Sequence, residues 1–232
     1  MARPIDTLFL DAGGVLVYPN WVRVADTLNR FGVKADATSL AAAEPHAKRQ
    51  IDVQHHVAVT NDRQRGWTYF NLILARAGIE ITSDVTAALD ELDVYHRRWN
   101  LWEHVPESVV PALGRLRAMG LRLVVVSNAN GTLHAAFERL GLLSLFDSVL
   151  DSHVEGIEKP DPRFFQIALE RAGARPESTL HVGDLYYIDV CGAHAAGLRA
   201  VLLDTANMYL DVDCARVTSL DELVDGLTRS IY

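Results

Sequence analysis

Residues 7–14 read Thr7-Leu-Phe-Leu-Asp-Ala-Gly-Gly14, a short apolar run that stops at an aspartate and two glycines. Such a run, bounded by glycine, predicts a buried strand that ends in a loop. Similar runs follow at 121–126 before Ser127-Asn128, at 179–182 before Gly183-Asp184, and at 198–203 before Asp204. A shorter strand is expected over 147–150. The sequence thus predicts several buried strands with polar residues at their carboxyl ends.

Helical patterns separate these runs. Apolar residues recur at helical spacing over 107–119, 133–140, 163–172 and 190–196. Each stretch is followed by glycine, the residue that most often ends a helix, at positions 120, 141, 173 and 197. Helices that alternate with buried strands form a parallel sheet covered on both faces. We therefore predict an α/β fold with a three-layer α/β/α, Rossmann-like core.

The segment from Asn20 to Trp102 interrupts this alternation. Amphipathic helical stretches dominate it, at 22–31, 64–77 and 85–100, and the Ala-rich segment 41–47 is a helix piece at most. No buried strand is evident there. We therefore predict an α/β core domain made of residues 1–18 and 102–232, with a helical domain inserted at 19–101.

Composition limits the classes of partner. The chain carries 22 Lys and Arg against 30 Asp and Glu, a formal net charge of −8, which argues against nucleic acid or anionic membranes. No apolar run approaches the ~18 residues of a membrane-spanning helix. Cys191 and Cys214 form no CxxC pair, and the first residues lack a signal-peptide pattern. We expect a cytoplasmic protein; the sequence leaves its oligomeric state open.

The predicted strand ends carry the residues suited to catalysis. Ligands of open parallel sheets bind beyond the carboxyl ends of the strands, where Asp11, Ser127 and Asp184 would meet. A carboxylate can attack phosphorus or carbon and form a covalent intermediate, and carboxylates also hold Mg²⁺. Lys159 and the Ser127 hydroxyl would bind phosphoryl oxygens. Gly13 and Gly14 would let free backbone amides approach the substrate.

These segments resemble the four ordered motifs of the haloacid dehalogenase-like superfamily. Phe9-Leu-Asp-Ala-Gly-Gly-Val-Leu16 resembles the first motif, usually written DxDGT, and Val125-Val-Ser-Asn128 resembles the second. Gly156-Ile-Glu-Lys-Pro-Asp-Pro162 resembles the third, and Val182-Gly-Asp-Leu-Tyr-Tyr-Ile-Asp-Val190 resembles the fourth, GDxxxxD. The resemblance covers residues 5–17 and 103–205. The insert lies where the family places a helical cap of the first type (C1), with expected hinges at 17–20 and 101–105.

The resemblance implies Mg²⁺-dependent hydrolysis of a small phosphorylated metabolite through an aspartyl-phosphate. It makes Asp11 the nucleophile and a metal ligand, and Ser127 and Lys159 the phosphate-binding catalytic groups. The other implied roles are metal binding by the Gly13 carbonyl and by Asp184, metal binding or orientation by Asp189, and substrate binding by Gly13, Gly14 and Asn128.

One departure leaves alternatives open. Phosphatases of the family carry a second Asp, a general acid and base, where this chain has Gly13. Haloacid dehalogenases lack it but usually replace the motif four acids, which this chain keeps as Asp184 and Asp189. The alternatives are a 2-haloacid dehalogenase-like enzyme and a weakly active protein that binds a phosphorylated ligand. Candidate substitutes for the missing acid lie in the insert: Lys34 and Lys48 as imine-forming lysines, and His46, His55 and His56 as proton donors.

Overall fold

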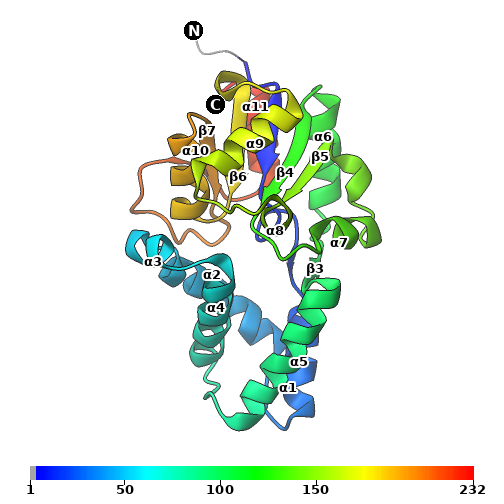
Figure 1. Ribbon diagram of the computed structural model, residues 1–232, viewed down its shortest axis with the longest axis vertical. Helices are drawn as coiled ribbons and strands as arrows, with labels where there is room; N and C mark the ends of the chain where they lie inside the picture. The colour runs from blue at the N-terminus through cyan, green and yellow to red at the C-terminus, as the bar shows by residue number, and fades with distance from the viewer. Residues whose placement is uncertain (1–3) are drawn as a thin grey trace. The chain divides into compact units, whose positions relative to one another are not determined.

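The computed structural model describes residues 4–232, except for the side chains of Gln54, His55 and Ala58. The chain forms two compact units (Figure 1). The first unit consists of two segments, the described residues up to Tyr18 and the segment Val105–Tyr232. The second unit is the segment between them, Pro19–His104. Strand β3 (Trp102–His104) pairs with β2 (Tyr18–Pro19) in a two-stranded sheet.

The first unit is built on a six-stranded sheet whose paired strands are all parallel. Strand β1 (Thr7–Leu10) lies at its centre, with Leu10 opposite Val125 of one neighbour and Val182 of the other. The order across the sheet is β5 (Ser148–Asp151), β4 (Arg122–Ser127), β1, β6 (Thr179–Gly183), β7 (Arg199–Leu203) and β8 (Ala215–Val217). Strands β4 and β5 extend the sheet on one side of β1, and β6, β7 and β8 extend it on the other, which makes the carboxyl end of β1 a topological switch point.

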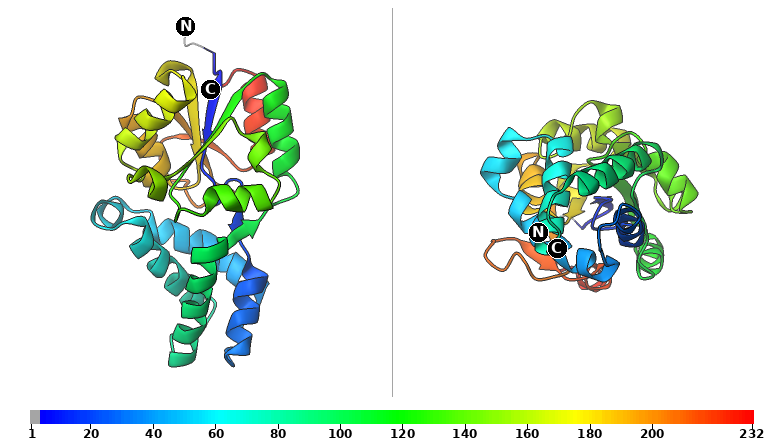
Figure 2. Two further views of the ribbon diagram at one scale, coloured as in Figure 1. Left: turned by 45° about the vertical axis from the view of Figure 1, so that its right-hand side comes forward. Right: turned by 90° about the horizontal axis from the view of Figure 1, so that it is seen from below.

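Helices cover both faces of this sheet (Figure 2). One face packs Phe9, Val124 and Val126 against Phe164 and Phe165 of a covering helix. The alternate strand residues, Leu8, Leu10, Leu123 and Val125, are also fully buried. The helices are α6 (Val109–Ala118), α7 (Leu133–Arg139), α8 (Ser152–Glu155), α9 (Pro162–Ala172), α10 (Cys191–Ala195) and α11 (Leu220–Thr228). The predicted three-layer α/β/α core is confirmed.

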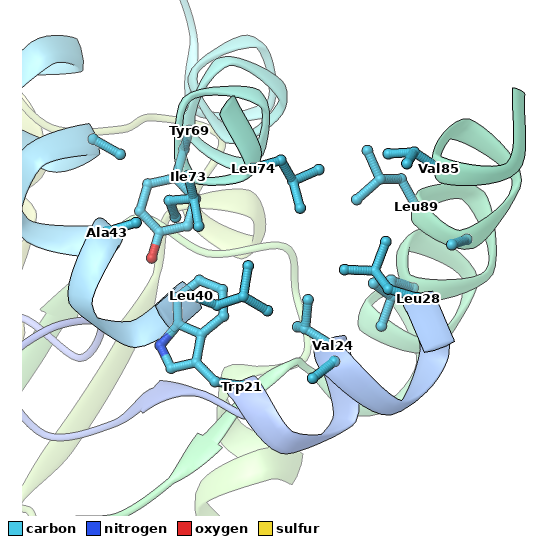
Figure 3. Packing of buried hydrophobic residues seen from close by; sticks show 14 of the residues in the cluster. Trp21, Val24, Leu28, Leu40, Ala43, Tyr69, Ile73, Leu74, Val85 and Leu89 are labelled. Atoms are coloured by element: carbon cyan, nitrogen blue, oxygen red, sulfur yellow. The ribbon is translucent and has the colours of Figure 1, made fainter. Parts of the chain in front are cut away.

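The second unit is a helical bundle with its own core. Its helices are α1 (Trp21–Arg30), α2 (Ala37–Ile51), α3 (Gln54–Val59), α4 (Asp62–Arg76) and α5 (Ser83–Trp99). Figure 3 shows Trp21, Leu40 and Leu74 turned toward a shared interior. Along the described chain, no helix has the length and apolarity that a bilayer crossing requires.

Candidate active site

The sheet brings two carboxylates together at its carboxyl edge. Asp11 follows β1 and Asp184 follows the neighbouring strand β6, and the Asp11 backbone N–H donates to the Val182 carbonyl at 2.9 Å. One oxygen from each of Asp11, Asp184 and Asp189 lies within 4.8 Å of the other two. Parallel pairing therefore juxtaposes acidic groups that are more than 170 residues apart in sequence.

Lys159 reaches this group from the loop before α9. Asp161 caps that helix by accepting from the Arg163 N–H at 2.9 Å. The Lys159 Nζ lies 2.9 Å from Asp11 Oδ1 and 2.6 Å from Asp189 Oδ1, and the residue is only 1% exposed. Burial by itself lowers the pKa of Lys159, but Asp11 and Asp189 outweigh burial and raise the pKa above the ordinary value. The ammonium is thus charged at neutral pH.

Asp189 is held by protein donors on both oxygens. Oδ1 accepts from Lys159 Nζ and lies 3.0 Å from His181 Nε2, while Oδ2 accepts from the Leu185 N–H at 3.0 Å. Burial by itself raises the pKa of Asp189, but Lys159 and His181 outweigh it and hold the pKa below the ordinary range. Of the two roles expected for Asp189, these contacts favour orientation over direct metal binding.

A π-helical turn and a glycine make this arrangement possible. The turn Tyr186–Val190 places the Asp189 side chain against Gly183 and His181 of β6. Within the turn, the Asp189 N–H donates to the Leu185 carbonyl at 2.8 Å. A Cβ on Gly183 would lie 2.0 Å from Asp189 Cγ. The glycine of the GDxxxxD segment is therefore required sterically, because any side chain there would occupy the space of the carboxylate.

His181 was missed by sequence reasoning. It lies inside β6, is fully buried, and packs edge-on against Phe165 with ring centroids 5.0 Å apart. Burial lowers the pKa of His181 below its ordinary value against the opposing effect of Asp189, so the imidazole is neutral near pH 7. The available signal was an ionisable residue within a buried strand, two positions before the Gly183-Asp184 pair.

The side chain of Asn128 bonds the backbone of Lys159, and its role in substrate binding stays a prediction. Its Nδ2 donates to the Lys159 carbonyl at 2.9 Å and its Oδ1 accepts from the Lys159 N–H at 2.8 Å. Both polar ends are therefore occupied in holding the lysine loop. Ser127, the last residue of β4, is buried, and its hydroxyl makes a long 3.3 Å contact with the Asn128 carbonyl.

The glycines after Asp11 form a tight loop, which corrects the expectation of two free amides. The Gly14 N–H donates to the Val17 carbonyl at 2.9 Å, and Gly14 has a φ of +78° that favours glycine. The Gly14 amide is therefore unavailable to a substrate. Gly13 forms an isolated bridge with Val17, and its role as a metal ligand stays a prediction.

The candidate substitutes for the missing acid all belong to the second unit. Lys48 is paired with Glu44 at 2.9 Å. Lys34, His46 and His56 lie in the same unit, while the side chain of His55 lies outside the described residues.

The charges at the sheet edge fit a divalent cation. Three carboxylates, those of Asp11, Asp184 and Asp189, face one ammonium, which leaves a formal excess of two negative charges. Uncompensated buried charge is costly, and hard oxygen donors are the ligands that Mg²⁺ prefers. Asp11 and Asp184 are the candidate ligands for such an ion.

Comparisons with known proteins match most of the chain to one family. A family model described as haloacid dehalogenase-like hydrolase matches residues 5–197. Haloacid dehalogenase-like hydrolase domain-containing protein 3 of Bos taurus is 31% identical over 192 residues, covering 81% of this chain and 76% of that protein. Glyceraldehyde 3-phosphate phosphatase of Methanopyrus kandleri is 34% identical over 136 residues, covering 57% of each. The chain spans about half the length of other curated relatives that it matches.

A solved structure shares the fold across nearly the whole chain. The HAD-hydrolase YfnB from Bacillus subtilis, in a form bound to magnesium, superposes with a TM-score of 0.71 at 18% identity, covering 97% of this chain and 99% of that one. The family model spans most of the sequence and includes Asp11, Ser127, Lys159 and Asp184. This chain is therefore a member of the haloacid dehalogenase-like hydrolase family.

Proposed function

We propose that this hydrolase cleaves a phosphate ester of a small metabolite, with Asp11 as the nucleophile and Mg²⁺ as the cofactor. One observation carries the proposal: the buried Lys159 ammonium lies 2.9 Å from Asp11, with Asp184 beside them. A nucleophilic carboxylate next to a fixed cation and a second carboxylate is the donor set that phosphoryl transfer needs. It cannot be explained as a surface ion pair, because Lys159 is almost fully buried.

Each site residue has its own role in the proposed reaction. A carboxylate oxygen of Asp11 forms a bond to phosphorus while the bond from phosphorus to the ester oxygen breaks. Water then cleaves the aspartyl-phosphate, which releases inorganic phosphate and restores the Asp11 carboxylate. Lys159 offsets the charge that develops on the phosphoryl oxygens, and Ser127 at the end of β4 is the candidate second donor. Bound Mg²⁺, held by Asp11 and Asp184, would reduce the repulsion between carboxylate and phosphate.

The relatives support a phosphorylated substrate. The Methanopyrus kandleri protein is named a glyceraldehyde 3-phosphate phosphatase, and its match covers 57% of this chain. We therefore propose a small phosphorylated metabolite as the substrate class. We assign its selection to the second unit, Pro19–His104, as the cap.

Gly13 narrows the expected substrates further. General acid help to a leaving group is typically worth ~10²–10⁴-fold, and glycine offers none. We therefore expect fastest turnover of phosphate esters or anhydrides whose leaving groups are weakly basic, since these need no proton in the transition state.

A second candidate, a 2-haloacid dehalogenase, is favoured by the Asp11-Ala12 start of the first motif and by Gly13, because a halide leaves without a proton. The formal excess of negative charge beside Asp11 opposes it, since a metal-independent reaction would leave that charge uncompensated. The two reactions differ in where solvent oxygen goes. Hydrolysis of an alkyl-enzyme ester would place oxygen from ¹⁸O-water in the Asp11 carboxyl, whereas cleavage of an aspartyl-phosphate at phosphorus places it in phosphate.

The test is a screen of phosphorylated metabolites and 2-haloacids, with Mg²⁺ and with EDTA. The proposal expects phosphate release that needs Mg²⁺ and disappears in Asp11→Asn. Halide release in EDTA would replace it with the dehalogenase reaction. A nearly inactive protein whose Gly13→Asp variant gains phosphatase activity would support the remaining alternative, a weakly active protein that binds a phosphorylated ligand.

A further inference from the structure

The proposed reaction uses Asp11, Lys159 and Asp184 but gives no role to the buried imidazole beside them. We propose that His181 is a positioning residue, which holds the Asp189 carboxylate in the orientation that places the Lys159 ammonium on Asp11. Its effect on turnover rests on the function proposed above.

A continuous chain of contacts connects His181 to the nucleophile. His181 Nε2 lies 3.0 Å from Asp189 Oδ1, and Lys159 Nζ lies 2.6 Å from the same oxygen. Lys159 Nζ lies in turn 2.9 Å from Asp11 Oδ1. Since one carboxylate oxygen serves both the imidazole and the ammonium, the position of His181 determines where that oxygen meets Lys159.

Burial makes the imidazole difficult to replace. His181 and Asp189 are fully buried and Lys159 is 1% exposed, so solvent does not substitute freely for a lost donor. Removing the His181 N–H would leave Lys159 as the remaining side chain that donates to Asp189 Oδ1 among the described contacts. The ammonium would then be drawn toward Asp189 and away from Asp11, because a buried carboxylate attracts the nearest charge strongly.

The surroundings of the ring fix its role as a donor. Its edge-on packing against Phe165, with centroids 5.0 Å apart, limits rotation of the imidazole. Nδ1 is buried and has no hydrogen-bond partner within the described part of the chain. The ring contacts the carboxylate through Nε2 and therefore carries a proton on that atom, since the carboxylate of Asp189 only accepts.

The composition of the chain allows a direct test. Lysine occurs only at positions 34, 48 and 159. Selective ¹⁵N and ¹³C labelling of lysine therefore gives a small set of NMR signals, and the Lys159 ammonium is identified by its loss in Lys159→Met. This readout reports the environment of Lys159 whether or not a substrate is known.

Three variants separate positioning from general destabilisation. His181→Leu removes the donor, and His181→Gln returns an N–H at a similar reach. Thr179→Val is the matched control, because Thr179 is a fully buried residue on the same face of β6 whose hydroxyl bonds the Arg175 carbonyl at 2.8 Å, outside the site. We expect His181→Leu to shift the Lys159 signal and lower kcat per folded protein about tenfold or more. His181→Gln should restore most of both, and Thr179→Val should change neither.

Each outcome is decisive. An unchanged Lys159 signal in folded His181→Leu, or an equal shift in Thr179→Val, would overturn the inference. Should His181→Leu fail to fold, ¹⁵N-histidine spectra of the wild-type protein decide the matter: a proton on Nε2 of His181 supports the inference, and one on Nδ1 overturns it. If the signals respond as expected but the wild-type protein hydrolyses no phosphate ester, the proposed function fails while the positioning role stands.

Discussion

The side chain of Asn128 is hydrogen-bonded at both of its polar ends to the backbone of Lys159. It accepts from the N–H at 2.8 Å and donates to the carbonyl at 2.9 Å. Together with Asp189, which holds the ammonium, this contact fixes Lys159 at its backbone and at its tip. A long flexible side chain is thereby held in one conformation before any substrate binds, which lowers the entropic cost of using it.

Replacing Asn128 should therefore loosen Lys159. Asn128→Ala removes two hydrogen bonds, each worth about 1 kcal/mol net, so we predict a loss of about 1–2 kcal/mol in unfolding free energy. Turnover should fall by more than substrate affinity, because the lysine stays present but is less well placed. Urea denaturation and steady-state kinetics measure the two effects. A variant with unchanged kcat would show that Lys159 does not depend on this contact.

Gly183 and Gly114 form a matched pair for the steric requirement at Asp189. A Cβ at Gly183 meets Asp189 Cγ at 2.0 Å, whereas a Cβ at Gly114, on the exposed side of α6, meets nothing within 4 Å. Gly183→Ala should cost about 1–3 kcal/mol of stability and disturb Asp189. Gly114→Ala should instead stabilise the helix by about 0.5–1 kcal/mol. Equal effects in thermal unfolding would contradict the assigned packing.

Glu103 is expected to make the free energy of unfolding of the second unit depend on pH. It accepts from Asn20, Arg23 and Tyr95, and although burial opposes them these donors lower the pKa of Glu103 below its ordinary value. A lowered folded-state pKa means that the stabilisation is present above the ordinary pKa and is lost as the pH falls through the folded value. Glu103→Gln should therefore be less stable than wild type at pH 7, with a difference that shrinks below pH 4.5. A difference that grows toward acid pH would refute this assignment.

The acidic group at the sheet edge predicts stabilisation by Mg²⁺. A ligand that binds only the folded state raises the unfolding free energy, by about 2.7 kcal/mol at a concentration 100 times its Kd. Mg²⁺ should raise the melting temperature of the wild-type protein, and Asp184→Asn should remove most of that rise. EDTA should lower the melting temperature of the Mg²⁺-loaded protein. A rise that survives in Asp184→Asn would place the ion elsewhere.

The sheet, and the edge of it that carries the aspartates, could be predicted from the sequence. Apolar runs mark the buried strands, and glycines mark the ends of the helices between them. Strand β8 was not predicted, since three residues are too few for a strand pattern to be recognised, and helix α11 was not predicted either. Helix α2 extends well beyond the Ala-rich segment and contains Pro45, so local propensity underestimated it. Burial in a tertiary core overrides such weak local preferences.

The contacts of the site were harder to predict than its residue types. Asp11, Lys159 and Asp184 were identified from polar residues at strand ends and from motif order. The roles of Asn128, Gly14 and His181 depend on which groups their polar atoms meet, and these partners come from elements distant in sequence or from a loop of particular shape. The type of a residue does not specify its hydrogen-bond partner. Coordinates are therefore needed to tell an amide that binds substrate from an amide that holds a loop.

Transfer of a phosphoryl group to Asp11 is tested most directly by acid quenching during turnover. Wild-type protein would be mixed with Mg²⁺ and the best phosphate ester from the screen, stopped in acid within the first turnover, digested and analysed by mass spectrometry. We predict that the peptide containing Asp11 gains one phosphoryl group, which hydroxylamine removes, and that Asp11→Asn shows neither this adduct nor product. Phosphate release by Asp11→Asn at the wild-type rate, with the peptide unmodified throughout, would contradict the account.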